Sequence, residues 1–327
     1  MSAGLDVVGI GNAIVDIIAQ AEDDFLDRHG MHKGAMTLID ESRAEALYHA
    51  MGPAVQLSGG SAGNTIAGLA SLGARTGYVG KLKDDALGAV FRHDIVSAGV
   101  RFSTLPAKEG PATARCLIFV TPDAQRTMNT YLGACANLGP EDIDAELVGS
   151  AAITYLEGYL YDPPQAKVAF HRAAEIAHAA ERKVALSLSD RFCVERYRRE
   201  FRKLAELHVD YLFANEGELT ALFETDLEAA LSEVANAVEI AAVTRGSAGS
   251  VIAAGSSRIA VEAAPVARVV DTTGAGDLYA GGFLFGLARG KALSECGRLA
   301  SLAAAEIISH YGGRPETPLA RYVTENS

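Results

Sequence analysis

The stretch VDTTGAGDLYAGGFLFGLARG, residues 270–290, decides which fold and which chemistry we expect of this chain. We expect a strand that ends at residues 268–270, a turn through Gly274 and Gly276, and an apolar helix behind that turn. Glycine lacks a Cβ atom, so the backbone can turn tightly there and approach a ligand closely. The unpaired N–H groups at the start of a helix favour a bound anion. Asp277 does not suit an anion site unless it takes a proton from a nucleophile that attacks a phosphate.

A second interpretation makes Asp277 an ordinary acid in the first turn of a helix, where the helix dipole also favours it. The rest of the expected helix argues for more than that. It is almost entirely apolar and contains Gly281 and Gly282, and an interior glycine costs about 1 kcal/mol relative to alanine. We therefore expect a buried helix with a close neighbour, and we favour phosphoryl transfer at the turn.

Composition limits the class of protein. The chain has 327 residues, of which 49% are apolar and 21% charged, with a net charge of −12. This is typical of a globular protein with a large core and argues against nucleic-acid binding. The N-terminus has no Lys or Arg before Arg28 and is interrupted by Asp6 and Asp16, so it resembles neither a signal peptide nor a membrane span. With four scattered cysteines and no CxxC motif, we expect a cytoplasmic protein with no membrane partner.

Two motifs near the N-terminus extend the argument. In GIGNAIVD, residues 9–16, the third glycine of a dinucleotide fingerprint would fall at Ile14, and the segment continues as a strand, so we reject that fingerprint. Asn12 and Asp16 are either a turn amide and an edge-strand acid or members of a site. SGGSAGN, residues 58–64, is a second glycine-rich turn from strand to helix and places Asn64 in the first helical turn. Two such turns suggest two faces of one cleft.

The spacing of the apolar segments predicts an α/β fold. Buried strands at residues 5–11, 75–81, 151–156, 184–188, 211–214 and 240–244 alternate with helices, which is typical of a Rossmann-like, doubly wound, mainly parallel sheet flanked by helices. Segments 12–19, 35–39, 101–105, 113–120 and 126–132 are β-rich and predict a small separate sheet that acts as a lid. We expect residues 1–11, 41–100 and 133–327 in the large domain, and 12–40 and 101–132 in the lid.

Two further motifs follow strands of the expected sheet. In NEGE, residues 215–218, Asn215 and Glu218 share the N-terminal end of a helix. They are either a helix cap with its partner acid or oxygen ligands for Mg²⁺, which is often held through its waters beside phosphates. Thr244, Arg245 and Gly246 form either a simple tight turn or a contact with a nucleotide.

Together, DTTGAGD with its trailing GGF, SGGSAGN and NEGE resemble the motifs of the ribokinase family of sugar and nucleoside kinases. The resemblance spans essentially the whole chain. GIGNAIVD, the RTM of residues 126–128 and the SLSDRF of residues 187–192 are most similar to the adenosine kinases within that family. The resemblance implies an enzyme that uses ATP and Mg²⁺ and binds a small-molecule acceptor. The chain has no GxxxxGK[ST] motif, so it is not a P-loop enzyme.

The resemblance also implies roles for individual residues. Asp277 would be the catalytic base, and the turn from Gly274 through Ala275 and Gly276 would hold the transferred phosphate. Arg126 would reach the phosphates when the lid closes. The remaining roles are acceptor binding for Asn12, Ile14, Asp16, Leu38, Gly59, Gly60, Ser61, Asn64 and Phe192, nucleotide binding for Asn215, Thr244, Arg245 and Gly246, and Mg²⁺ binding, through water, for Asn215 and Glu218. Asp16 would bind the ribose hydroxyls and Phe192 would stack on the base.

Two departures from the adenosine kinase pattern bear on the acceptor. Ala13 stands where animal adenosine kinases usually have proline, and Tyr159-Leu160 replaces an aromatic pair that helps to hold adenine. These changes affect the expected base and not the kinase chemistry. We expect phosphorylation of the 5′-hydroxyl of a nucleoside, adenosine first, by a monomer or homodimer. The alternatives are a kinase for a free sugar such as ribose and a nucleoside-binding protein without turnover.

Overall fold

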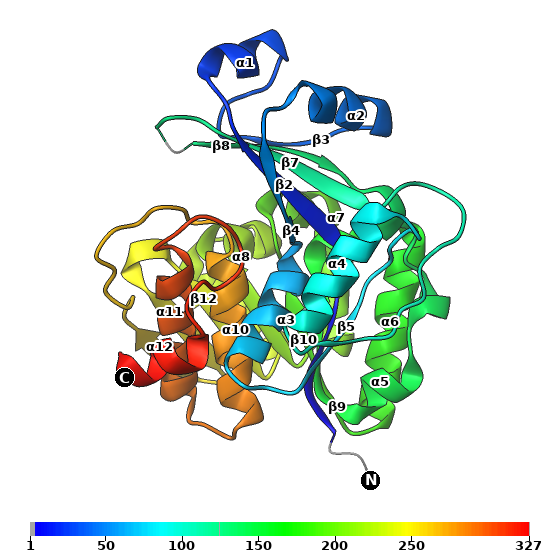
Figure 1. The fold of residues 1–327 in the computed structure, drawn as a ribbon. Coiled ribbons are helices and arrows are strands. Elements are labelled where there is room, and N and C mark those ends of the chain that lie inside the picture. The colour runs from blue at the N-terminus through cyan, green and yellow to red at the C-terminus, as the bar shows by residue number, and fades with distance from the viewer. Residues whose placement is uncertain (1–3, 124, 327) are drawn as a thin grey trace.

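The computed structural model describes residues 4–123 and 125–326, which form two β-sheets (Figure 1). The strands of the large sheet are β1 Leu5–Ile10, β5 Thr76–Val79, β6 Arg101–Phe102, β9 Ala151–Glu157, β10 Lys183–Ser187, β11 Tyr211–Asn215, β12 Ile240–Thr244, β13 Ser250–Ala254 and β14 Ser257–Val261. Their order is β14-β13-β12-β11-β10-β9-β1-β5-β6. All pairs from β12 to β6 are parallel, whereas β13 and β14 form an antiparallel edge. The predicted doubly wound, mainly parallel sheet is confirmed.

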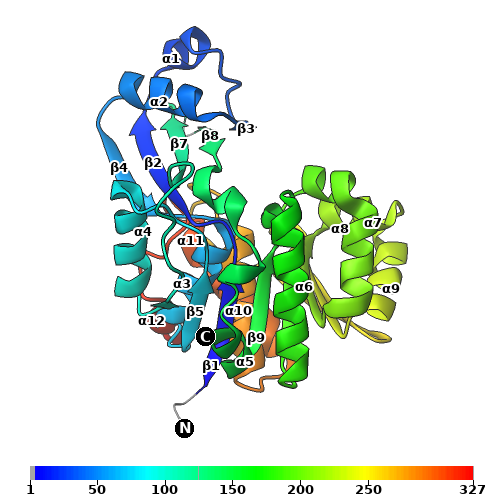
Figure 2. The ribbon, with the colours of Figure 1, turned by 90° about the vertical axis from the view of Figure 1, so that its right-hand side faces the viewer.

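Helices cover both faces of this sheet, as Figure 2 shows from the side. One face carries α5 Ala145–Ser150, α6 Pro164–Ala179, α7 Arg191–His208, α8 Glu216–Phe223 and α9 Leu227–Ala237. The other carries α3 Ser61–Ser71, α4 Ala86–Ser97, α10 Ala275–Ala288 and α11 Leu293–Ile307, with α12 Leu319–Glu325 packed behind α11. Short 3₁₀ helices are η1 Gly133–Asn137, η2 Pro140–Asp142, η3 Gly158–Tyr161 and η4 Gly246–Ala248. No helix in the described part of the chain combines the length and apolarity needed to cross a bilayer.

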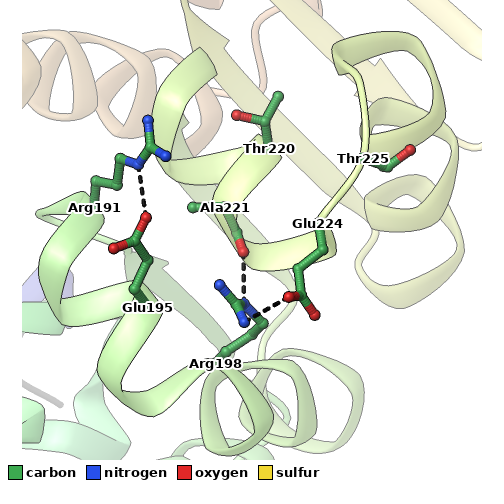
Figure 3. Close-up of a pocket in the computed structure, with 7 residues that line it drawn as sticks. All are labelled: Arg191, Glu195, Arg198, Thr220, Ala221, Glu224 and Thr225. Carbon is green, nitrogen blue, oxygen red and sulfur yellow. Dashed lines mark hydrogen bonds and ion pairs between the residues drawn. The ribbon is translucent and has the colours of Figure 1, made fainter.

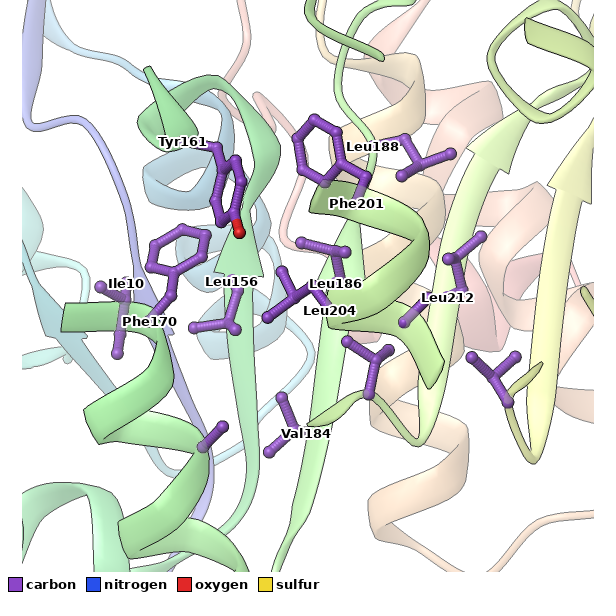
Figure 4. Packing of buried hydrophobic residues seen from close by; sticks show 14 of the residues in the cluster. Ile10, Leu156, Tyr161, Phe170, Val184, Leu186, Leu188, Phe201, Leu204 and Leu212 are labelled. Carbon is purple, nitrogen blue, oxygen red and sulfur yellow. The ribbon is translucent and has the colours of Figure 1, made fainter. Parts of the chain in front are cut away.

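Each face of the large sheet has its own core, because successive side chains of a strand point to opposite faces. Val7 of β1 belongs to the core beneath α3 and α10, whereas Val8 and Ile10 belong to the core beneath α6 and α7. Figure 4 shows the second of these cores, in which aliphatic side chains of neighbouring strands pack against aromatic rings of the covering elements. The rings of Tyr161 and Phe201 stack there with centroids 4.7 Å apart.

The small sheet lies across one end of the large one and carries two helices on its far side (Figure 1). Its strands are β2 Ile14–Gln20, β3 Met36–Leu38, β4 Ala54–Ser58, β7 Ala114–Val120 and β8 Arg126–Tyr131, and its helices are α1 Asp23–Arg28 and α2 Glu41–Ala50. The strand order is β3-β8-β7-β2-β4. The predicted second sheet is therefore present, and residues 12–19 enter it as a strand rather than as a dinucleotide-binding helix.

Three expectations about individual strands are wrong. β4, placed by us with the large domain, pairs with β2 in the small sheet. Segment 101–105, expected in the small sheet, instead contributes β6, which pairs with β5 in the large sheet. Residues 268–270 form no strand, and the Val270 N–H donates to the carbonyl of Ile308 at 2.8 Å. Short apolar segments fit either sheet equally well, so their local patterns did not distinguish the partners.

The order of the strands fixes where a site can form. From β1 the chain builds β5 on one side and later β9 on the other. In open α/β sheets such a change of direction leaves a crevice at the carboxyl ends of the strands. Asn12, just after β1, and Glu157, the last residue of β9, both lie at this crevice.

Two glycines allow helix α10 to pack closely between two other helices. A Cβ atom on Gly281 would lie 3.1 Å from the carbonyl oxygen of Thr65 in α3. A Cβ atom on Gly282 would lie 2.7 Å from the Cα atom of Ala300 in α11. This confirms the close neighbours that we expected from the two glycines.

We predict that Gly282→Ala destabilises the protein, because the new methyl group would overlap the backbone of α11. Overpacking of this kind costs about 1–3 kcal/mol, which would lower the urea midpoint measured by circular dichroism. Gly149→Ala in α5 is the matched control, since its Cβ atom would meet only Ala180 and Ile176 side-chain atoms at 3.9 Å. The control should be neutral or slightly stabilising. Equal midpoints for the two variants would contradict the packing argument.

Candidate active site

A single large cavity lies at the crevice between the two sheets. Its volume is about 1200 Å³, and the carboxyl ends of β1, β9, β11 and β12 reach it. Most of the predicted site residues line it: Asn12, Ile14, Asp16, Leu38, Gly60, Ser61, Asn64, Phe192, Asn215, Glu218, Thr244, Gly274, Gly276 and Asp277. Gly59, Arg126, Arg245, Gly246 and Ala275 do not belong to the lining. The fold thus gathers residues from both glycine-rich turns and from strands of both sheets around one space.

The two glycine-rich turns meet at Asp277. Ser61 Oγ donates to Asp277 Oδ1 at 2.6 Å, and Asn64 Nδ2 donates to Oδ2 at 3.0 Å. Gly60 and Gly274 precede the two helices with φ values of +83° and +77°, a region that side chains with a Cβ atom rarely adopt. Burial raises the pKa of Asp277, while the bonds from Ser61 and Asn64 act in the opposite direction. The arrangement presents a fixed, desolvated carboxylate to the cavity.

The turn before α10 has the form of an anion site. Gly274 is the N-cap of this helix, and the N–H groups of its first turn have no partner within the helix. The N–H of Ala275 is an exception among those we assigned to phosphate, because it donates to the carbonyl of Thr272 at 3.2 Å. Gly276 is exposed at the cavity. The backbone of this turn can therefore approach a phosphate closely.

Arg126 of β8 forms a buried ion pair with Asp271, which lies in the loop just before the turn. Asp271 also accepts hydrogen bonds from the N–H of Thr273 at 3.0 Å and from that of Gly312 at 3.2 Å. Nε and Nη2 of Arg126 have no hydrogen-bond partner among the residues that the structure describes. The small sheet is thus linked to the anion site through Arg126, although the guanidinium does not line the cavity.

Another part of the cavity lining is formed by β2 and its neighbours. Asp16 lies directly against Gly59, where a Cβ atom would be 2.4 Å from Asp16 Oδ2. Burial raises the pKa of Asp16 to about 6, against the opposing effect of Arg126 and Arg314. Within the described part of the chain no residue donates a hydrogen bond to the Asp16 carboxylate. Its oxygens are therefore available to hydroxyl groups of a ligand.

The wall above Asp16 is apolar. The lining side chains there come from the small sheet and from the residue that follows β8: Ile14, Met36, Leu38, Cys116, Ile118, Met128 and Leu132. Phe192, in the first turn of α7, lines the same cavity, with 74% of its surface exposed. Asp190 caps that helix by accepting a hydrogen bond from the N–H of Phe192 at 2.7 Å, which fixes the backbone of Phe192 at the start of the helix.

Glu157, which we did not predict, is the most enclosed acid of the cavity at 1% exposure. It accepts hydrogen bonds from Asn12 Nδ2 and from the N–H of Ala62, both at 2.7 Å. Burial raises the pKa of Glu157 to about 7 despite these bonds. It holds the Asn12 amide and caps α3, whose N-cap Gly60 has no side chain to do so. Its position as the polar end of an apolar strand was the signal available in the sequence.

Asn215 and Glu218 form a capping box at the start of α8. Asn215 Oδ1 accepts from the N–H of Glu218 at 2.8 Å, and Glu218 Oε2 accepts from the N–H of Asn215 at 2.9 Å. Burial raises the pKa of Glu218 to about 7, and the charges of Asp190 and Asp277 add to the rise. The capping interpretation is correct, and both residues also line the cavity.

Asn215 and Glu218 could hold a divalent cation only together with water and substrate phosphates as further ligands. No cluster of three or more His, Cys, Asp or Glu residues in metal-binding arrangement occurs within residues 4–123 and 125–326. Glu218 and Asn215 nevertheless offer oxygen atoms. The neighbouring acids make the surroundings of Glu218 negative, and a cation would offset that charge. Mg²⁺ commonly keeps several waters and binds through one or two carboxylates and substrate phosphates. The residues present fit that mode of binding.

The residues Thr244, Arg245 and Gly246 differ in whether they reach the cavity. Thr244 ends β12 and lines the cavity. Arg245 points to Glu216, with Nε 3.4 Å from Oε2, and Gly246 has a φ of +57° with open space around it. Only the first of the three reaches the cavity in this structure.

A second pocket, of about 370 Å³, lies outside the crevice between α7 and α8 (Figure 3). Its charged residues are paired with one another. Arg191 Nε lies 2.8 Å from Glu195, and Arg198 Nη1 lies 2.8 Å from Glu224. Because these charges already neutralise each other, the pocket has no evident ligand chemistry, and the large cavity is the candidate active site.

Comparisons with known proteins agree with this site. Residues 37–319 match the description "pfkB family carbohydrate kinase". The adenosine kinase of Sinorhizobium meliloti has a TM-score of 0.93 and is 54% identical, covering 99% of this chain and 100% of that chain. A probable sugar kinase of Rhizobium etli CFN 42 has a TM-score of 0.93 and is 50% identical, covering 99% and 98%. The ATP-dependent ribose-1-phosphate kinase of Halopiger xanaduensis is 33% identical over 70% of this chain and 73% of that protein.

These relatives are named for different acceptors, so they establish the class of reaction and not the acceptor. The family match extends from β3 into the start of α12 and includes the second glycine-rich turn, Asn215 and Asp277. The predicted resemblance to ribokinase-type kinases is thereby confirmed. The chain belongs to the PfkB family of carbohydrate kinases and is an ATP-dependent kinase.

Proposed function

We propose that this kinase phosphorylates the 5′-hydroxyl of a nucleoside, with adenosine as the first candidate acceptor and AMP as the product. The observation that carries the proposal is the shape of one cavity. It has an unbonded carboxylate, Asp16, beside an apolar wall, and a fixed carboxylate, Asp277, at the anion turn. A nucleoside has the matching parts in the same order: an apolar base, ribose hydroxyls and a primary hydroxyl. The likeness to the adenosine kinase of Sinorhizobium meliloti supports this choice.

The charge of the cavity supports a neutral acceptor over a sugar phosphate. Its lining contains six acids, namely Asp16, Glu157, Asp162, Asp190, Glu218 and Asp277. Among the residues that the structure describes, Arg196 is the one basic residue of the lining, and it is already paired with Asp162, with Nη1 2.9 Å from Oδ1. A phosphorylated acceptor such as ribose 1-phosphate would meet these acids without a free cation to neutralise it. ATP differs because backbone N–H groups and Mg²⁺ can hold its phosphates.

The apolar wall favours a nucleoside over free ribose. A free sugar offers much less apolar surface than a purine to pack against Ile14, Leu38 or an exposed phenyl ring. A purine buries such surfaces, and stacking of a base on an aromatic side chain contributes about 1–3 kcal/mol. Free ribose is therefore the second candidate acceptor.

In the proposed mechanism the residues of this chain act by position and charge. Asp16 accepts hydrogen bonds from the ribose hydroxyls, which places the 5′-oxygen toward Asp277. Asp277 accepts the proton of that hydroxyl as the oxygen attacks the γ-phosphorus of ATP; the bond from that phosphorus to the β,γ-bridging oxygen breaks, and ADP leaves. The donated bonds from Ser61 and Asn64 keep the two oxygens of Asp277 in place. The turn at Gly274–Gly276 stabilises charge on the transferred phosphate. Mg²⁺, held through water by Asn215 and Glu218, would neutralise part of the charge of the ATP phosphates.

We further propose that the small sheet acts as the lid predicted from the sequence. Its residues Ile14, Asp16, Leu38, Cys116 and Met128 form one side of the cavity, whereas Asp277 and the anion turn belong to the large domain. Closure of such a lid excludes water from the transferred phosphate. The Arg126–Asp271 pair spans the two parts and would have to open for Arg126 to reach a phosphate.

The proposal is tested by one screen of acceptors with ATP and Mg²⁺. We expect adenosine to give a kcat/KM well above that of guanosine, inosine, ribose and ribose 1-phosphate. A preference for ribose would remove the role given to the apolar wall. ATP hydrolysis that no acceptor stimulates, together with tight adenosine binding, would support the alternative of a binding protein without turnover.

We predict that Asp277→Asn lowers kcat by about 10²- to 10⁴-fold, the usual contribution of a positioned general base. The asparagine can still accept from Asn64 and donate to Ser61, so both KM values should stay within a few-fold. Steady-state kinetics and a thermal melt measure these effects. Glu228→Gln, in the first turn of α9, is the matched control for the helix dipole and should leave kcat unchanged. Near-parental kcat in Asp277→Asn would make Asp277 an ordinary first-turn acid.

We predict that Phe192→Ala raises KM for a nucleoside about ten- to hundredfold and leaves KM for ATP unchanged, because only the base stacks on this ring. Leu207→Ala is the control, since Leu207 is also an exposed apolar residue of α7 but lies outside the cavity. Unaltered nucleoside kinetics in Phe192→Ala would count against stacking at this position. The preference for nucleosides over sugars would then rest on the other apolar side chains alone.

A further inference from the structure

The segment that follows α11 returns to the active site, although the proposed function uses none of its residues. The N–H of Gly312 donates to Asp271 Oδ2 at 3.2 Å. The backbone of Gly313 lies directly against Asn64, because a Cβ atom there would be 2.4 Å from Asn64 Nδ2. Further along, Glu306 of α11 accepts from the N–H of Thr317 at 2.8 Å. The segment is thus fixed on both sides of Arg314.

The guanidinium of Arg314 contacts both the small sheet and the large domain. Nε donates to the carbonyl of Ser58 at 3.0 Å, Nη2 donates to Ser58 Oγ at 3.1 Å, and Nη1 donates to the carbonyl of Gly63. Ser58 is the last residue of β4 in the small sheet, and Gly63 belongs to α3 in the large domain. Helix α3 also carries Ser61 and Asn64, the two residues that hold Asp277. The Arg314 side chain therefore lies between the end of β4, in the small sheet, and helix α3, which holds the proposed base.

The charge of Arg314 lies close to the two carboxylates of the proposed reaction. Four groups interact with it electrostatically: Tyr78, Asp16, Asp277 and Asp94. Burial lowers the pKa of Arg314 to about 10, which leaves it a cation at neutral pH. Its charge lowers the pKa of Asp16 and of Asp277, each of which burial raises. Arg126 has the same effect on Asp16, and Asp277 has the opposite one.

We propose that Arg314 is a positioning residue for the reaction: it orients β4 and α3 around the acceptor, and its positive charge favours the carboxylate forms of Asp16 and Asp277. The inference rests on the proposed roles of these two carboxylates. Arg314 is not among the residues that line the cavity, so it acts through Ser58, Gly63 and its electric field rather than by contact with a substrate. The three donor directions of a guanidinium match this task, because lysine offers a compact point charge without the planar fork.

Two substitutions separate geometry from charge. Arg314→Lys keeps the cation but loses the three-way contact. We expect it to raise KM for the acceptor about tenfold to a hundredfold, the range for hydrogen bonds of a charged group, with KM for ATP unchanged. Arg314→Met also removes the charge. The pKa of Asp16 should then rise, so that kcat/KM begins to fall at a pH about one unit higher than in the parent as the pH is lowered.

The sign of that shift follows from the role of Asp16. The ionised carboxylate accepts bonds from hydroxyl groups, and loss of a nearby cation favours the protonated form. The acid limb of kcat/KM should therefore move upward in Arg314→Met and stay in place in Arg314→Lys. Arg75→Met is the matched control, because its partner Asp6 lies away from the cavity and remains paired with Arg289 at 3.2 Å.

A third variant keeps the test independent of the folding of Arg314→Met. Ser58→Ala removes only the oxygen that Nη2 contacts, and we expect a rise in acceptor KM of about threefold to tenfold. In the Arg314→Lys background the same change should have no further effect. All kinetics use whichever acceptor the parent turns over fastest, beside a thermal melt. Variants that melt earlier but keep parental KM, kcat and acid limb would reduce Arg314 to a structural residue. That result overturns this inference alone, because the parent's own turnover in the same assay tests the proposed function.

Discussion

The two hydrogen bonds from Ser61 and Asn64 to Asp277 are the interaction on which the rest of the site depends. They join residues more than 200 positions apart in the chain, so the first glycine-rich turn, the second one and the helices behind them must come together within a few tenths of an ångström. A buried carboxylate without partners would take up a proton, because desolvation disfavours the charged form. The donated bonds oppose that effect and fix the carboxylate at the edge of the cavity. The contacts that would position the proposed base are therefore also contacts between distant parts of the fold.

The glycines behind the site make this approach possible. Gly68 of α3 lies where a Cβ atom would be 2.4 Å from Leu278, the residue next to Asp277, and Gly282 of α10 lies against the backbone of α11. Larger residues would separate α3 from α10 and move Ser61 and Asn64 away from the carboxylate. Interior glycines weaken a helix by about 1 kcal/mol each. That cost is offset by close packing, which brings the N-terminal ends of two helices to one point.

The sequence predicted the features that local patterns encode. Most of the buried strands, both glycine-rich turns and the polar residues at or just after the ends of β1, β11 and β12 appear where we expected them, because each depends on a few neighbouring residues. Pairing between distant segments was less accessible. β4 and β6 are short, and each joins the sheet that we did not expect, because long-range packing decides their partners. Arg314 gave no signal beyond its position after two glycines, and the contact of Arg126 with Asp271 depends on how the small sheet lies over the large one.

The buried acids of the cavity differ in how their charge is compensated, and this difference separates structural groups from ligand-binding ones. Glu157 accepts from the backbone and side chain of other elements, and Glu218 is occupied by its capping box. Asp277 has both oxygens engaged but faces the anion turn. Asp16 alone in this group is balanced by the charges of Arg126 and Arg314, without a hydrogen bond from any residue that the structure describes. An ionised carboxylate that is held by distant charges keeps its lone pairs free, and hydroxyl groups are the donors that would satisfy them. This asymmetry supports our proposal of a neutral polyol acceptor, and it gives the two arginines behind the acidic cavity a role in balancing the charge of Asp16.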